Sequence, residues 1–205
     1  MKRPTDGARA GSFLWMFTAL SACAGGGPGA ECVNAVDCGE GLLCVDWACT
    51  QVASVDRGGV YVDPETGLEW QRSAPGETMS WDSAVAYCAD LVLHGGGWRL
   101  PSVSELRSLI RGCEGTETGG GCLATDTCLA FESCLTAPCD GCAPNAGPSD
   151  GCYRPEELEG SCSWYWTSSP LAEHPDQRAW YVIFDQAHVC GRSKDFAFGA
   201  VRCVR

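Results

Sequence analysis

The stretch Gly97-Trp-Arg-Leu-Pro-Ser-Val-Ser-Glu-Leu106 decides the fold of the larger part of this 205-residue chain. Ser102 and Glu105 have the spacing of a capping box, in which each end of the pair satisfies a backbone N–H of the other at the start of a helix. Gly112 then predicts where this helix stops. Four apolar residues recur at helical spacing and should form one inward-facing stripe: Val103, Leu106, Leu109 and Ile110.

Around this helix the sequence predicts another helix and several short strands. Val60–Val62 and Leu68–Gln71 flank the turn Asp63-Pro-Glu-Thr-Gly67, which is typical of a hairpin. Ser80 can cap a helix whose inward stripe is formed by Trp81, Ala84, Val85, Cys88 and Leu91. Strands are expected at 180–184 and 196–204. The order of strands, helices and strands predicts an α+β fold.

The N-terminus has the layout of a bacterial lipoprotein signal. A basic segment, residues 1–9, precedes the apolar run Gly11–Leu20 and the sequence Leu20-Ser-Ala-Cys23. An apolar run this short cannot span a bilayer, so residues 1–22 are predicted to be removed and Cys23 to be acylated. An uncleaved anchor and an ordinary signal with a chance cysteine are the alternatives. With Ala24 following Cys23, the expected location is the cell envelope, lipid-anchored at the outer membrane or cell surface.

After this signal, residues 23–31 form a lipidated tether, and residues 32–50 form a small four-cysteine module. A module of this size cannot fold by hydrophobic burial alone and needs disulfides. Three pairings are possible, and we favour Cys32–Cys44 with Cys38–Cys49. A spacer role is expected for the module, with a protein-contact site as the alternative.

The main domain, residues 58–205, carries a cysteine-rich insertion at 113–162. Outside the cytoplasm closely spaced cysteines form disulfides, and the one C-x2-C pair, Cys139 and Cys142, lacks the second pair that a zinc ribbon needs. The eight insertion cysteines can pair among themselves. Cys88, Cys190 and Cys203 remain, so either one thiol is free or a bridge joins the insertion to the rest of the domain.

The negative net charge of the chain disfavours two classes of partner, nucleic acids and anionic membrane surfaces. After removal of residues 1–22 the chain keeps 11 basic and 25 acidic side chains, a formal net charge of −14. Such a surface repels nucleic acid and anionic lipid headgroups. Contact with a membrane is therefore expected only through the lipid anchor, and no nucleic-acid partner is expected.

Five motifs in order resemble a known family. They are Asp63-Pro-Glu-Thr-Gly-Leu-Glu-Trp-Gln71, Trp81-Asp-Ser-Ala-Val-Ala-Tyr-Cys88, Gly97–Leu106, Tyr165-Trp-Thr-Ser-Ser169 and Val201-Arg-Cys-Val-Arg205. Together they resemble the C-terminal domain of Legionella collagen-like proteins. The turn at Trp98–Pro101 is also similar to one in formylglycine-generating enzymes, which implies a C-type-lectin-like fold. In such folds a disulfide joins the first helix to the last strand, which here implies Cys88–Cys203.

This resemblance implies binding rather than catalysis: surface attachment and recognition of glycans, including sulfated polysaccharides. The chain departs from the namesake because it has no collagen-like repeat. Its negative charge disfavours a polyanionic ligand, so heparin binding should be weak. The Glu-Pro-Asn and Gln-Pro-Asp triplets of calcium-dependent lectins are absent. The expected ligand is a glycan or a protein.

No nucleophile constellation is recognised, and the chain is predicted not to be an enzyme and to need no cofactor or metal. His94, His174 and His188 are each expected in a surface or loop position. The main alternative is an oxidoreductase or modifying enzyme of formylglycine-generating type, which would need a reduced pair such as Cys190 and Cys203. A structural envelope component is the third hypothesis.

Aromatic residues are the candidates for ligand contact. Trp164, Tyr165 and Trp166 could stack on sugar rings, although Trp166 and Trp180 are expected mainly in the core. Adjacent strand residues point to opposite faces, so one of Trp164 and Tyr165 should be exposed. We expect the recognition surface to be built from residues 113–162 and the strand 165–169. Arg99 is expected to hold its turn by hydrogen bonds.

Overall fold

The computed structural model describes side chains for residues 58–205 and the backbone of two strands, residues 42–45 and 48–51. The chain divides into two compact units, Met1–Gln51 and Val52–Arg205. In the first unit, β1 (Leu42–Val45) pairs antiparallel with β2 (Ala48–Gln51). The signal segment, Cys23 and the proposed bridges Cys32–Cys44 and Cys38–Cys49 lie outside the part of the chain whose side chains are described.

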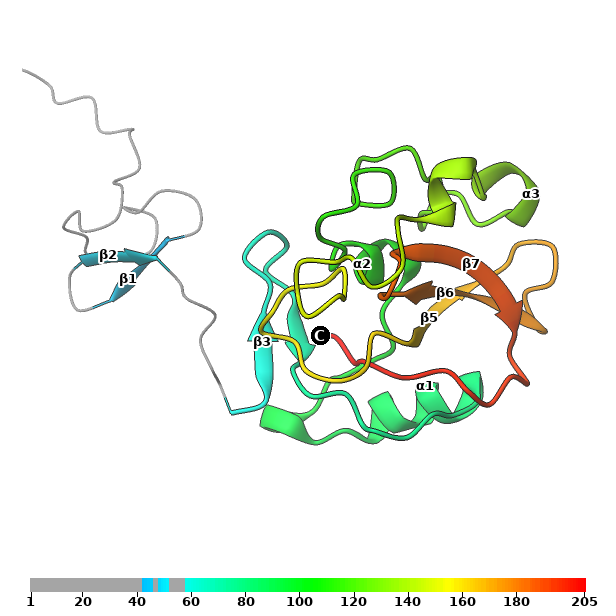
Figure 1. Cartoon of the computed structure of the whole chain (residues 1–205). Helices are drawn as coiled ribbons and strands as arrows, with labels where there is room; N and C mark the ends of the chain where they lie inside the picture. Colours follow the sequence, from blue (N-terminus) through cyan, green and yellow to red (C-terminus); the bar gives the residue numbers. More distant parts are fainter. Residues whose placement is uncertain (1–41, 46–47, 52–57) are drawn as a thin grey trace, which may run out of the picture. The chain divides into compact units, whose positions relative to one another are not determined.

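A three-stranded antiparallel sheet organises the second unit. Its strands are β5 (Trp164–Pro170), β6 (Arg178–Ile183) and β7 (His188–Ser193), in the order β5-β6-β7. Other elements cover both faces of the central strand β6, and its side chains are therefore mostly apolar on both faces. Trp180 faces one buried cluster and Tyr181 faces another. The sheet therefore lies between α1 on one side and α2 with the insertion on the other (Figure 1).

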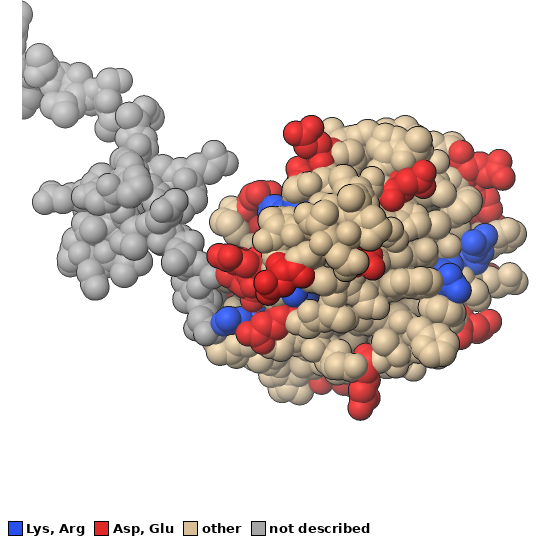
Figure 2. Space-filling view, viewed as in Figure 1, with Lys and Arg blue, Asp and Glu red and all other residues tan. Residues whose placement is uncertain are grey.

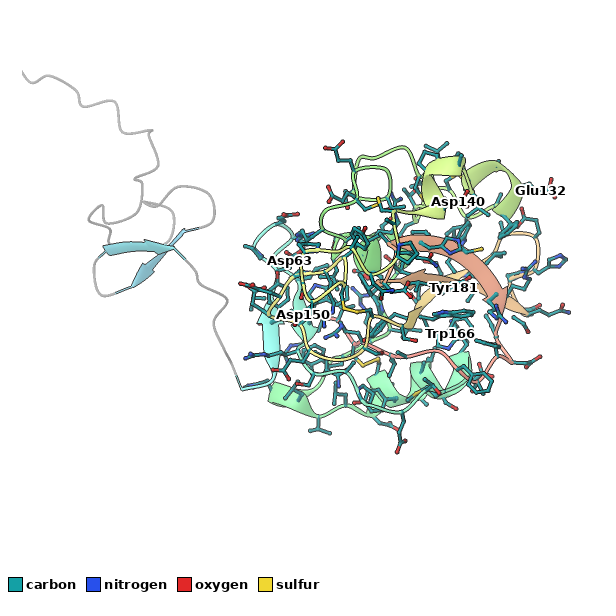
Figure 3. The ribbon with its side chains drawn as sticks, in the orientation of Figure 1. Asp63, Glu132, Asp140, Asp150, Trp166 and Tyr181 are labelled. Carbon is teal, nitrogen blue, oxygen red and sulfur yellow. A yellow bond between two sulfur atoms is a disulfide. The ribbon has the colours of Figure 1, made fainter. Side chains whose placement is uncertain are left out.

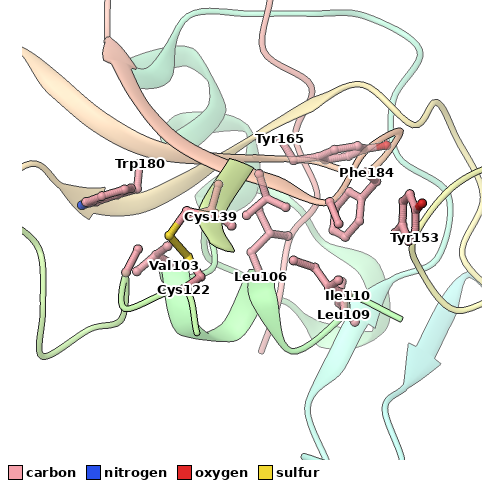
Figure 4. Packing of buried hydrophobic residues seen from close by; sticks show 14 of the residues in the cluster. Val103, Leu106, Leu109, Ile110, Cys122, Cys139, Tyr153, Tyr165, Trp180 and Phe184 are labelled. Atoms are coloured by element: carbon pink, nitrogen blue, oxygen red, sulfur yellow. A yellow bond between two sulfur atoms is a disulfide. The ribbon is translucent and has the colours of Figure 1, made fainter. Parts of the chain in front are cut away.

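The helix predicted from the capping box forms as α2 (Val103–Arg107), with both hydrogen bonds of the box present. All four residues of the predicted stripe are buried (Figure 4). The regular helix is shorter than predicted, since it ends at Arg107 instead of continuing to Gly112. Gly112 still adopts a positive φ of 84°, which allows the chain to turn into the insertion.

The opposite face of the sheet is covered by α1 (Trp81–Asp90), which Ser80 caps as predicted. Cys88 on this helix is bonded to Cys203, with Cα atoms 5.4 Å apart, so the bridge implied by the family resemblance is present. The predicted hairpin forms as β3 (Val60–Val62) and β4 (Glu69–Gln71). A short 3-10 turn, η2 (Leu93–Gly95), follows α1.

The insertion is closed by its own disulfides. It contains only two short helical segments, α3 (Phe131–Cys134) and η3 (Ala137–Asp140). Its eight cysteines pair as Cys113–Cys142, Cys122–Cys139, Cys128–Cys134 and Cys152–Cys162. No bridge crosses from the insertion to the rest of the domain among these residues. Cys190 is consequently the free thiol of the described domain.

No disulfide joins the insertion to the rest of the described domain. Buried arginines connect the two parts through hydrogen bonds. Arg107 on α2 donates hydrogen bonds to the carbonyl oxygens of residues 116, 117 and 124 in the insertion. Arg202 near the C-terminus donates to the carbonyl oxygens of Gln71, Arg72 and Glu159. Burial lowers the pKa of both guanidinium groups by desolvation. Each side chain ties together segments that are distant in sequence.

One strand prediction was wrong and one strand was missed. Residues 196–204 form no strand of the sheet and contribute isolated bridges, among them Met79 with Gly199 and Tyr165 with Ala200. The strand β7 was not predicted, and the strand expected at 180–184 runs from 178 to 183. Within the described ranges no helix has the length and apolarity needed to cross a bilayer.

Candidate functional site

Of the three aromatic residues predicted to contact ligand, two belong to the core. Tyr165 is 0% and Trp166 is 2% exposed. The Tyr165 hydroxyl donates to the carbonyl of Ser161, and the Trp166 indole donates to the carbonyl of Met79. Their ring faces are therefore not available to a ligand, because both rings are packed and both polar groups are already paired. Trp166 and Trp180 lie in the core, as expected.

Trp164 is half-buried and belongs to an aromatic cluster that also contains Tyr181, Phe196 and Phe198. The ring of Trp164 stacks on Tyr181 and on Phe196, each with 5.2 Å between ring centroids. Phe196 contacts Phe198, also at 5.2 Å. Phe198 is 66% exposed, which is unusual for so large an apolar side chain. The aromatic cluster thus extends from the core to the surface.

A shallow crevice lies between the rings of the aromatic cluster, and it has no room for a water molecule, so a ligand can contact only the outer edges of these rings. Its position is between the sheet and the α1 side of the domain, where Trp166 and Tyr181 lie next to each other (Figure 3). Gly199 is also part of the lining. A larger residue would not fit at this position, because a Cβ atom there would lie 2.1 Å from the Trp166 indole. The residues that line it are Trp164, Tyr165, Trp166, Tyr181, Phe196 and Gly199.

Arg192 on β7 brings a positive charge to the aromatic cluster. Its guanidinium carbon lies 4.6 Å from the ring centroid of Trp164 and 3.8 Å from that of Phe196. Such cation–π contacts hold the guanidinium in place without neutralising it. Within residues 58–205 no carboxylate lies within ion-pair distance of Arg192.

Some of the arginines in this acidic domain pair with carboxylates, and Arg192 does not. Residues 58–205 contain 20 acidic and 10 basic side chains. Figure 2 shows acidic groups spread over the visible face, while a group of basic atoms lies at the right, near the end of β7. Arg99, Arg111 and Arg205 each pair with a carboxylate. Arg192 has no carboxylate within ion-pair distance in the described domain, and the same holds for Arg107, Arg154, Arg178, Lys194 and Arg202; Arg192 is the one held between Trp164 and Phe196.

Cys190 and His188 lie on β7 on the same face as Arg192, because alternate residues of a strand point the same way. Both are half-buried, and burial lowers the pKa of His188. Burial also raises the pKa of Tyr181, with the neighbouring Cys190 thiol as the next cause. The spacing His188-x-Cys190 was not recognised as a candidate pair from the sequence. Within the described domain no hydrogen bond joins the His188 and Cys190 side chains.

The accessible Cys190 thiol gives a direct chemical test of the disulfide assignment. We expect Cys190→Ser to lower by one the number of thiols that a thiol-specific reagent detects in the unreduced, denatured chain. Counting thiols in parallel with the unchanged chain makes the comparison independent of the four-cysteine module. An unchanged count would show that Cys190 has a disulfide partner.

The surface expected at residues 113–162 and 165–169 is only partly accessible. On β5, Thr167 and Ser169 are buried, which leaves Ser168 exposed in that part of the strand. The insertion exposes Leu123, at 49%, as an isolated apolar side chain. Arg99 forms a double hydrogen bond with Glu105, at 2.7 and 2.6 Å, and so holds its turn as expected. The aromatic cluster is therefore the better candidate for ligand contact.

Comparison with known proteins agrees with the motifs. No group of three or more potential metal ligands occurs in the described ranges. No curated protein and no solved structure shows significant similarity to the chain. A family model, described as the Lcl C-terminal domain, matches residues 59–205, the whole of the α+β domain just described. Since this match covers more than half of the sequence, the chain belongs to the Lcl C-terminal domain family.

Proposed function

We propose that this protein is a non-enzymatic binding or adhesion protein whose ligand contacts the aromatic cluster and Arg192. The observation that carries the proposal is the position of these side chains. Phe198 is 66% exposed and Arg192 has no carboxylate partner in the described domain. Trp, Tyr and Arg are the residues most enriched where binding energy is concentrated in protein interfaces.

The fold and the location form part of the same proposal. The Cys88–Cys203 bridge and the order of elements support a C-type-lectin-like fold, which uses one scaffold for many ligands. The motif Leu20-Ser-Ala-Cys23 supports a lipid-anchored protein of the cell envelope, at the outer membrane or cell surface. Such an arrangement would present the domain to ligands outside the cell.

An oxidoreductase of formylglycine-generating type is the weaker hypothesis. Its chemistry would need two reduced cysteines close together. In the described domain Cys203 is bonded to Cys88, so Cys190 is without the partner that such a pair would require. The Cys190→Ser variant distinguishes the two hypotheses. If this variant has one thiol fewer but binds its ligand as well as the unchanged chain does, the result agrees with the binding proposal.

Anchoring can be tested separately. The Cys23→Ser variant is expected to leave the membrane fraction and appear in the soluble fraction, because the acylated residue would be absent. A matched change at Ser21, Ser21→Ala, keeps the cysteine and should leave fractionation unchanged. Membrane retention of Cys23→Ser would contradict the lipoprotein assignment.

Ligand binding is tested with the exported chain, residues 23–205, carrying Cys23→Ser so that no lipid is attached. We would screen it on a glycan array and against a displayed library of random peptides, at physiological salt. Binding that falls at least tenfold in Phe198→Ala supports the aromatic cluster as the contact surface. Binding that is unchanged in Phe198→Ala and Trp164→Ala would contradict it, as would the absence of any saturable ligand.

A further inference from the structure

We propose that the ligand at this site is a protein segment that places a carboxylate against Arg192 and an apolar side chain against the aromatic cluster. The inference rests on the proposed binding function and narrows it to one class of partner. A glycan is the competing occupant, and the experiment below separates the two.

The carboxylate follows from the state of Arg192. Trp164 and Phe196 contact the Arg192 guanidinium through their rings, and no carboxylate of the described domain lies within ion-pair distance of it. Its polar neighbour is the neutral Tyr181 hydroxyl, which interacts with Arg192 and whose pKa is raised above its ordinary value, mainly by burial. A guanidinium offers parallel donors that match a carboxylate in two hydrogen bonds. The protein supplies no such carboxylate within the described domain.

The apolar side chain follows from the exposed end of the aromatic cluster, where Phe198 is 66% exposed and packs on Phe196. The cluster consists of aromatic rings and contains no carboxylate or amide side chain. A sugar would bury hydroxyl groups there with few partners, at a cost of about 1–3 kcal/mol for each unpaired group. In addition, Trp164 already stacks on Tyr181 and Phe196, so its ring is less available for a pyranose. An apolar side chain has no such cost.

The surrounding charge restricts the partner further. The domain is acidic as a whole, so a uniformly acidic partner would be repelled at long range. One acidic group next to an apolar residue avoids this repulsion and still pairs with Arg192. The expected partner sequence therefore has an isolated Asp, Glu or chain-terminal carboxylate beside a Phe, Leu, Ile or Trp residue.

The test uses the exported chain, residues 23–205 with Cys23→Ser, and a displayed library of random 12-residue peptides. We expect the selected peptides to share an acidic residue next to an apolar one. For the best peptide, Kd should rise at least tenfold with Arg192→Gln and also when the acidic residue of the peptide is replaced by its amide. Arg178→Gln is the matched control, because Arg178 stacks on Phe131 on the opposite face of β6. Its effect should be less than twofold.

Three results would overturn the inference. One is selection of peptides without acidic residues, and another is equal weakening by Arg192→Gln and Arg178→Gln. The third is binding of a glycan at the aromatic cluster, lost in Phe198→Ala, with no peptide selected. That third result leaves the proposed binding function intact. Absence of both peptide and glycan binding overturns the function as well.

Discussion

Loss of the Cys88–Cys203 bridge is expected to lower the free energy of unfolding by about 4 kcal/mol, because the bridge closes a long loop in the unfolded chain. The two cysteines are separated by 115 positions, and both side chains are fully buried. The bridge also fixes α1 to the C-terminal segment, which carries no regular strand of its own. Urea unfolding of the double variant Cys88→Ala/Cys203→Ala, followed by tryptophan fluorescence, measures the effect.

Cys190→Ala is the control for this experiment. It removes a half-buried thiol that is outside any disulfide, and we expect a change of less than about 1 kcal/mol. If the double variant were as stable as Cys190→Ala, the bridge would not be what holds the C-terminal segment to α1.

Replacement of Arg202 by methionine is expected to lower the free energy of unfolding by about 3 kcal/mol. Arg202 is 1% exposed as a whole residue, and its guanidinium donates hydrogen bonds to three backbone carbonyl groups. Each carbonyl left buried without a partner costs about 1 kcal/mol or more. Methionine retains much of the apolar packing, so the measured loss reports mainly on these hydrogen bonds. Thermal and urea unfolding provide the measurement.

Arg99→Met is the matched control, since Arg99 makes a surface ion pair with Glu105 and its side chain is 52% exposed. Exposed pairs contribute about 0–1 kcal/mol, so this variant should remain close to the unchanged protein. Equal stability of the Arg202→Met and Arg99→Met variants would show that the buried guanidinium does not connect the C-terminal segment to β4 and the 155–160 loop.

Local signals predicted the helices correctly because capping depends on residues a few positions apart. Ser80 and the pair Ser102 and Glu105 each satisfy backbone groups of their own helix. Helix length was predicted less well. Leu109 and Ile110 are buried as the periodic pattern indicated, yet they lie beyond the end of α2. Burial of a stripe therefore does not require regular helix throughout.

The late strands show where sequence patterns fail. The segment 196–204 is rich in apolar residues because it passes between α1 and the sheet, not because it pairs along its length. The strand β7 contains Cys190, Gly191 and Arg192, which break the apolar alternation of a typical strand. Its pairing with β6 is set by the turn between them, and tertiary contacts decide such cases.

The candidate site was predictable only in part. Alternation along β5 predicted that one of Trp164 and Tyr165 would be exposed. Tyr165 is buried, and Trp164 is half-buried because Tyr181, Phe196 and Arg192 cover its ring. Phe196, Phe198 and Arg192 join Trp164 through tertiary contacts that no local pattern encodes. The expectation that the insertion forms the recognition surface came from its rigidity, which does not show where apolar side chains become exposed.

The most direct test of the central claim compares Phe198→Ala with Leu123→Ala in binding of the strongest hit from the glycan and peptide screen. Both residues are exposed apolar side chains, one in the aromatic cluster and one in the insertion. Neither change should affect stability appreciably, because both side chains are largely solvated. We predict at least a tenfold loss of affinity for Phe198→Ala and less than a twofold change for Leu123→Ala. The reverse pattern would place the binding surface on the insertion and contradict the assignment to the aromatic cluster.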